Sequence, residues 1–74
     1  MSKNLLHSAG EALYGPRWQS DLARDLGVSD RTVRRWVAGD DPPPGVYIDL
    51  LRLVVERQVA LDDLVDALKR AGAP

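Results

Sequence analysis

Three arginines stand close together in the middle of the chain, at positions 31, 34 and 35. A guanidinium group is a planar fork of donors that matches the O6 and N7 atoms of guanine, and it matches phosphate oxygens equally well. At the helical period the three arginines share one arc, and the opposite arc is apolar: Val33, Trp36 and Val37. A helix with this pattern would bury one face and offer three cations to a polyanion. The competing interpretation is a plain solvated face.

Other reactive residue types are scarce. The chain has no cysteine, which excludes a disulfide framework and a thiolate metal site. His7 is its only histidine and has no partner in the sequence pattern for metal binding or acid–base work. The aspartates within residues 62–66 precede Lys69 and Arg70, a pattern that complements a helix dipole better than it builds a catalytic cluster. We therefore predict no catalytic residue, no metal and no cofactor, and a protein that is not an enzyme.

Length and charge limit the alternatives further. The 74 residues suffice for one small domain, and a hydrophobic fraction of 45% is typical of a folded chain. The formal net charge of −1 argues against binding of nucleic acid by bulk positive charge, so any such binding must come from a local cluster. No apolar run approaches the roughly 18 residues of a membrane span, and the N-terminal residues lack a signal-peptide pattern. We expect a cytoplasmic protein without a membrane partner.

Glycine and proline divide the chain into four expected helices. Apolar spacing predicts helices over residues 3–14, with Ser2 as its N-cap, and over 17–26. Gly10 lies inside the first of these, which suggests close approach of a neighbouring helix. Ser29 is the expected N-cap of a third helix that ends before Gly39. The fold class expected is all-α, with DNA-reading helices in residues 1–39 and a stiff proline-rich connector at 40–45.

The last segment, residues 46–72, carries a sustained apolar repeat at spacings of three and four. Its members expected in a dimer interface are Leu50, Val54, Leu61, Leu64 and Leu68. Such a stripe suits a long helix that pairs with a second copy of the chain. Two helices broken near residues 59–61 are the alternative, and a continuous or barely kinked helix is favoured. Arg57 is the one misfit on the stripe, and we expect its stem to lie along the groove with its charge at the edge.

The helices over residues 17–26 and 29–38 are joined by a tight turn. A small residue in the first helix, Ala23, allows the second to cross closely, and Gly27 supplies the turn. Apolar residues on the facing sides would fix the crossing angle. This pattern is typical of a helix-turn-helix, in which the second helix enters the major groove of DNA.

The segment resembles the helix-turn-helix of the Cro/lambda-repressor-like (XRE-type) regulators of phages and bacteria. The matching positions are Gln19, Ala23, Gly27, Val33 and Trp36. The motif covers about a quarter of the chain, and the whole chain is similar to small phage or prophage repressors, among which those that accompany anti-CRISPR genes are one group. The long C-terminal segment departs from the five-helix pattern of the superfamily, so the dimer geometry of the family is not carried over.

The resemblance implies roles for individual residues. Those implied to approach base edges are Asp30, Arg31 and Arg35. Those implied to contact the DNA backbone are Gln19, Ser29, Thr32 and Arg34. Arg17 and Tyr14 flank the start of the second helix and are further candidates for phosphate contact. Asp30 has an alternative role as an acid in the first turn of a helix, and Ser29 can act as cap alone.

These observations predict a sequence-specific regulator of double-stranded DNA, most simply a homodimeric repressor that reads a palindromic operator without a small-molecule ligand. The alternative is a protein-interaction module, an antitoxin or adaptor, that acts through its apolar C-terminal helix. A phage DNA-architectural protein of excisionase type is a third and weaker interpretation.

Overall fold

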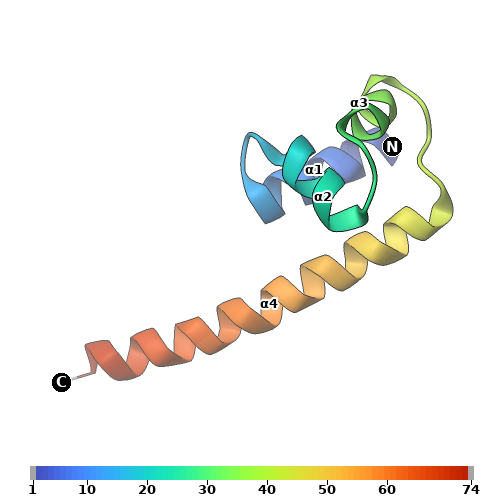
Figure 1. The fold of residues 1–74 in the computed structure, drawn as a ribbon. Helices are drawn as coiled ribbons and strands as arrows, with labels where there is room; N and C mark the ends of the chain where they lie inside the picture. Colours follow the sequence, from blue (N-terminus) through green and yellow to red (C-terminus); the bar gives the residue numbers. More distant parts are fainter. Residues whose placement is uncertain (1, 74) are drawn as a thin grey trace.

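The computed structural model describes residues 2–73, with side chains from Leu5 onward. Every regular element in this range is an α-helix: α1 Ser2–Tyr14, α2 Trp18–Leu26, α3 Asp30–Ala38 and α4 Pro44–Gly72 (Figure 1). The predicted fold class, three short helices followed by one long helix, is confirmed. The N-cap predicted at Ser2 lies outside the described side chains. None of the helices in the described range is long and apolar enough to cross a membrane.

The core lies where α1, α2 and α3 meet the first half of α4. Its buried members are Leu6, Trp18, Leu22, Ala23, Val33, Trp36 and Leu50. All four helices contribute, and both tryptophans are inside, which the apolar spacing predicts for Trp36. The helical period places Val37 at the edge of the inward arc of α3, and this side chain is 38% exposed instead of buried.

Close packing of α1 against α2 depends on Gly10. A Cβ atom at this position would lie 2.2 Å from Cε3 of Trp18 and 2.4 Å from its Cδ2. No side chain fits in that space unless the indole moves, and Trp18 is only 2% exposed. The sequence prediction of a close helix approach at Gly10 is therefore confirmed, and Trp18 is the group that approaches.

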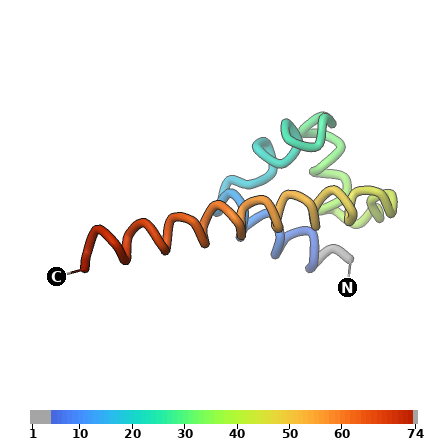
Figure 2. The backbone as a smooth tube through the Cα atoms, turned by 90° about the horizontal axis from the view of Figure 1, so that it is seen from below, coloured from blue at the N-terminus to red at the C-terminus, as the bar shows by residue number. Residues whose placement is uncertain are grey.

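Helix α4 is one continuous helix, which decides between the two alternatives left by the sequence. It begins at Pro44, two residues before the predicted start, because a proline is well suited to the first turn, where its missing N–H has no intrahelical partner. The preceding Pro42 is buried, so part of the connector packs against the globule. The second half of α4 extends past the other three helices (Figures 1 and 2), which gives the molecule extents of 52 × 23 × 21 Å.

Arg57 fastens α4 to the end of α1. Its Nη1 donates a hydrogen bond of 2.8 Å to the main-chain oxygen of Leu13, and its guanidinium carbon lies 6.0 Å from the centre of the Tyr14 ring. The last carbonyls of a helix lack intrahelical partners, so Arg57 satisfies one of them. The misfit in the apolar stripe is thus a tertiary contact within the chain.

Tyr14, the last residue of α1, links this helix to α2. Its hydroxyl donates a hydrogen bond of 2.5 Å to Oδ2 of Asp25 at the end of α2. Burial and the Asp25 carboxylate raise the pKa of Tyr14 to about 12. This contact turns the hydroxyl toward α2, so Tyr14 is not placed for the phosphate contact suggested by its sequence position.

The raised pKa of Tyr14 predicts a loss of stability at alkaline pH. In the unfolded chain this tyrosine loses its proton near pH 10, whereas the folded protein keeps it until about pH 12. Its contribution is therefore fully present below pH 10 and is lost as the pH rises from 10 to 12. We expect the free energy of unfolding, measured by urea titration, to fall more steeply over this range in the wild type than in Tyr14→Phe. Parallel pH profiles for the two proteins would contradict the assignment.

Candidate nucleic-acid interface

The N-terminus of α3 is fixed by the cap predicted from the sequence. Ser29 has an extended backbone, with φ −80° and ψ 157°, and its Oγ accepts a hydrogen bond of 3.2 Å from the N–H of Thr32. The hydroxyls of these two residues also lie 3.0 Å apart and share a hydrogen bond. Both residues, expected at the DNA backbone, thus sit together at the exposed start of α3.

The turn between α2 and α3 holds the two helices at one crossing. Gly27 adopts a left-handed conformation, φ 74°, that other residues adopt at a cost, and it ends α2. The N–H of Val28 then bonds to the carbonyl of Ala23 at 2.9 Å, and Ala23 is 1% exposed in the contact. The small residue and the turn glycine occupy the places that the helix-turn-helix pattern requires.

A second link across the same crossing was not foreseen. The hydroxyl of Ser20 in α2 donates a hydrogen bond of 2.9 Å to Oδ2 of Asp30, the first residue of α3. Asp30 therefore has a partner inside the chain and lies in the first helical turn. This geometry favours its alternative role as a helix-terminus acid over its implied role at a base edge.

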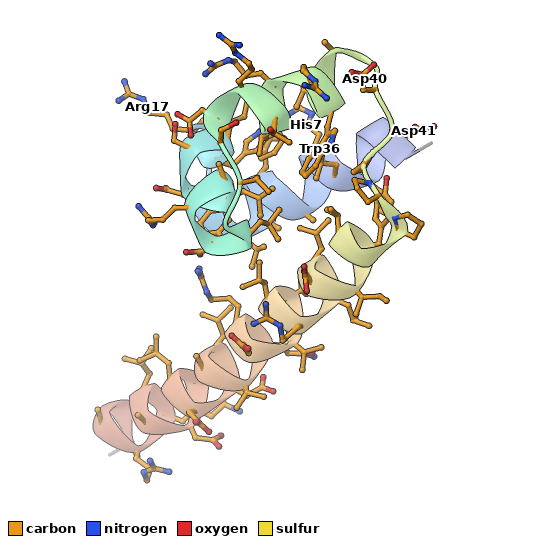
Figure 3. The ribbon with its side chains drawn as sticks, turned by 45° about the vertical axis from the view of Figure 1, so that its right-hand side comes forward. His7, Arg17, Trp36, Asp40 and Asp41 are labelled. Carbon is orange, nitrogen blue, oxygen red and sulfur yellow. The ribbon has the colours of Figure 1, made fainter. Side chains whose placement is uncertain are left out.

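The outward face of α3 carries the three arginines. All three side chains are exposed, and nitrogen-tipped side chains project from this side of α3, away from α4 (Figure 3). Among the described side chains, Arg31 and Arg34 have no ion-pair or hydrogen-bond partner. Arg35 differs, because its Nε lies 3.5 Å from Oδ2 of Asp40, just beyond the end of α3. Sequence periodicity could not show this pair, since Asp40 lies in the connector.

The start of α2 extends the basic surface. Arg17 is exposed and points outward at the first turn of α2 (Figure 3). Gln19, two residues further along, is half-buried, which leaves part of its side chain available. The exposed cations at the start of α2 and on the outward side of α3 are therefore Arg17, Arg31, Arg34 and Arg35, and the hydroxyls of Ser29 and Thr32 lie at the start of α3. We call this set the arginine face.

The candidates for other chemistry take up ordinary structural roles. His7 forms a pair of 3.2 Å with Glu11 one turn along α1, and its ring lies 5.5 Å from that of Trp18. Within residues 5–73, no group of three or more acidic or histidine side chains is arranged to hold a metal ion.

The apolar stripe of α4 has two different environments. Leu50 is 4% exposed and belongs to the core of its own chain, so the prediction that it contributes to a dimer interface is wrong. It packs inward because this part of α4 covers α1. The other predicted interface residues stay at the surface: Val54, Leu61, Leu64 and Leu68. The stripe thus begins as core and ends as an uncovered row.

Comparison with known proteins found no matching family model, no matching curated protein and no matching solved structure. The function of this protein is therefore inferred from the geometry of the chain itself.

Proposed function

We propose that this protein is a sequence-specific regulator that binds double-stranded DNA through α3, acts as a homodimer in the cytoplasm and represses transcription by occupying a promoter. The observation that carries the proposal is the arginine face. Most of its guanidinium groups are exposed on one side of α3, and the opposite side of α3 is packed into the core through Val33 and Trp36. A rigid base under an exposed basic helix is what insertion into the major groove, about 12 Å wide, requires.

The position of α3 supports access to DNA. Helix α3 lies on the far side of the core from α4 (Figure 1), so pairing through α4 leaves the arginine face open. In this proposal Arg31 and Arg35 approach base edges. The surrounding groups contact phosphates and set the register on the duplex: Arg17, Gln19, Ser29, Thr32 and Arg34.

The test is selection of binding sites from a random double-stranded DNA library by the purified protein. We expect enrichment of one inverted repeat, with half-sites about 34 Å apart or a multiple of that distance. A single enriched half-site would contradict the dimer, and no enrichment at all would contradict sequence-specific binding. Footprinting upstream of the protein's own gene would then show whether that site is used there.

Two triple variants test whether DNA binding depends on the arginines of α3 or on the total positive charge of the protein. The first replaces Arg31, Arg34 and Arg35 with alanine. The second removes the same number of charges from α4, by replacing Arg52, Lys69 and Arg70 with alanine. We expect the first to lose selection of the site and the second to retain it. Equal losses would show that binding depends on total charge rather than on α3.

Arg34→Ala is expected to weaken binding to all DNA sequences alike. An exposed arginine on phosphate releases counterions when it binds, so its loss lowers the salt slope of log K by about one unit per half-site. The slope is measured by titration at several salt concentrations, with Arg70→Ala on α4 as the control. An unchanged slope in Arg34→Ala would remove this residue from the phosphate contacts.

A second candidate function is favoured by the uncovered row of α4. Leu61, Leu64 and Leu68 are each more than half exposed, which would suit a module that binds a different protein. A wild-type protein that stays monomeric in sedimentation and enriches no DNA site would favour this candidate.

A further inference from the structure

The apolar surface along α4 continues into a groove between α4 and α1. One hollow of this groove is lined by Leu5 and Ala9 from α1 and by Leu51 and Val54 from α4. A second hollow, with a volume of about 430 Å³, shares Val54 and continues toward Leu61. We call the two hollows together the α1–α4 groove. Val54 and Leu61, which line the second hollow, are also members of the uncovered row.

Residues 63–72 of α4 form the part that lies beyond the groove, and we call this part the overhang. Its apolar side chains, Leu64, Val65 and Leu68, are 52%, 46% and 61% exposed. At about 1.5 Å per residue the overhang is about 15 Å long, which is less than two heptads of a coiled coil. A stable interface buries about 800 Å² on each partner, and two such short segments packed only on each other fall short of that area.

We propose that two copies of the chain associate with their α4 helices antiparallel, so that the overhang of each copy lies in the α1–α4 groove of the other. This inference rests on the homodimer of the proposed function and specifies its geometry. A two-fold axis that crosses the apolar stripe at the level of residues 59 and 60, whose own side chains are on other faces of α4, brings each overhang to the partner's groove. The groove and the overhang lie on either side of that level along one helix. The pairing is reciprocal, so the groove and the overhang of both copies are covered.

The charges along α4 favour the same orientation. The acidic run Asp62, Asp63 and Asp66 is exposed and precedes the basic end at Lys69 and Arg70. Asp62 is the member of this run that borders the α1–α4 groove, and in a parallel pair it would lie beside Asp62 of the other copy. Like charges side by side are destabilising. An antiparallel pair about this axis moves the two basic ends far apart and places Asp62 of each copy beside Arg57 of the other, which carries the opposite charge.

The antiparallel register places Leu68 of one copy beside Leu51 of the other, and this defines a charge-swap test. Leu51→Lys places a cation in the groove, and Leu68→Glu places an anion on the overhang. We expect each variant alone to sediment as a monomer at concentrations where the wild type is a dimer. We expect an equimolar mixture of the two to recover the dimer, since one contact then joins opposite charges and the other is unchanged.

Matched controls use exposed apolar residues on the back of α4. Ile48→Lys and Val59→Glu introduce the same charges at positions 70% and 56% exposed, outside the groove. We expect both to remain dimers. Circular dichroism of each variant at low concentration, where all are monomers, separates loss of association from loss of folding.

Several outcomes would overturn the inference. These are a wild type that is monomeric at all concentrations, a dimer that Leu51→Lys leaves intact, and monomers that do not recover on mixing. Dissociation by Ile48→Lys instead would place the interface on the back of α4. Each of these results leaves selection of DNA by the arginine face to be judged on its own, and loss of that selection leaves the sedimentation result standing.

Discussion

Arg35→Ala is expected to lower specific DNA affinity by about 5- to 150-fold per half-site, which corresponds to about 1–3 kcal/mol for one bidentate contact to a base pair. The loss should be confined to the preferred sequence, and one position of the operator should become degenerate. The reason is geometric. A fork that meets guanine O6 and N7 contributes only where guanine is present, whereas a contact to phosphate contributes everywhere.

The ion pair of Arg35 with Asp40 allows a prediction about the stability of the same variant. Asp40 lies 3.5 Å from Arg35 in the free protein, and both side chains are mostly exposed, so the pair adds little to stability. Binding of Arg35 to a base requires the guanidinium to leave or share this carboxylate. We therefore expect Arg35→Ala to keep the wild-type melting temperature.

The measurement is binding of Arg35→Ala to a library of operator variants, compared with Arg52→Ala, which removes an exposed arginine paired with Glu56 on α4. Equal loss of affinity by Arg35→Ala on every sequence would show that Arg35 contacts the backbone. A wild-type binding profile would remove Arg35 from the interface.

Gly10→Ala is expected to destabilise the fold by about 1–3 kcal/mol, although helix propensity alone predicts a gain of about 1 kcal/mol. The added methyl would lie within 2.2–2.9 Å of three atoms of the Trp18 ring. Trp18 is enclosed by the core and cannot swing outward, so α1 and α2 must move apart. For a domain of this size that is a large fraction of the total stability.

Gly45→Ala provides the control for this prediction. Gly45 also lies within a helix, and a Cβ atom built there meets no other atom within 4 Å. We expect this variant to be neutral or slightly more stable in urea denaturation. If Gly10→Ala were stabilised as well, the close contact with Trp18 could not be a feature of the folded protein.

Local patterns in the sequence were sufficient for the helices and for the two buried residues of α3. The period of apolar residues placed Val33 and Trp36 inside, and the rules for helix ends placed the cap at Ser29 and the turn at Gly27. These features depend on residues a few positions apart, so the chain itself specifies their geometry.

Contacts between side chains of different helices could not be predicted from local sequence patterns. The bonds of Ser20 to Asp30, Tyr14 to Asp25 and Arg57 to Leu13 join residues 10, 11 and 44 positions apart. Each depends on how two helices cross, which periodicity does not determine.

The error at Leu50 has the same origin. A repeat of three and four predicts a stripe along the whole of α4, but it does not show where the stripe stops covering its own chain. Only the position of α1 decides that Leu50 is inside and Leu61 outside.

The projection of α4 beyond its neighbours has a consequence for how the chain orders itself. A helical segment without tertiary contacts is held only by its own backbone bonds, and short isolated helices are marginal in water. The last turns of α4 in a lone molecule should therefore fray, and association should restore them. Helical content per residue would then rise with protein concentration, and amide hydrogens near Leu68 would exchange fastest in dilute solution.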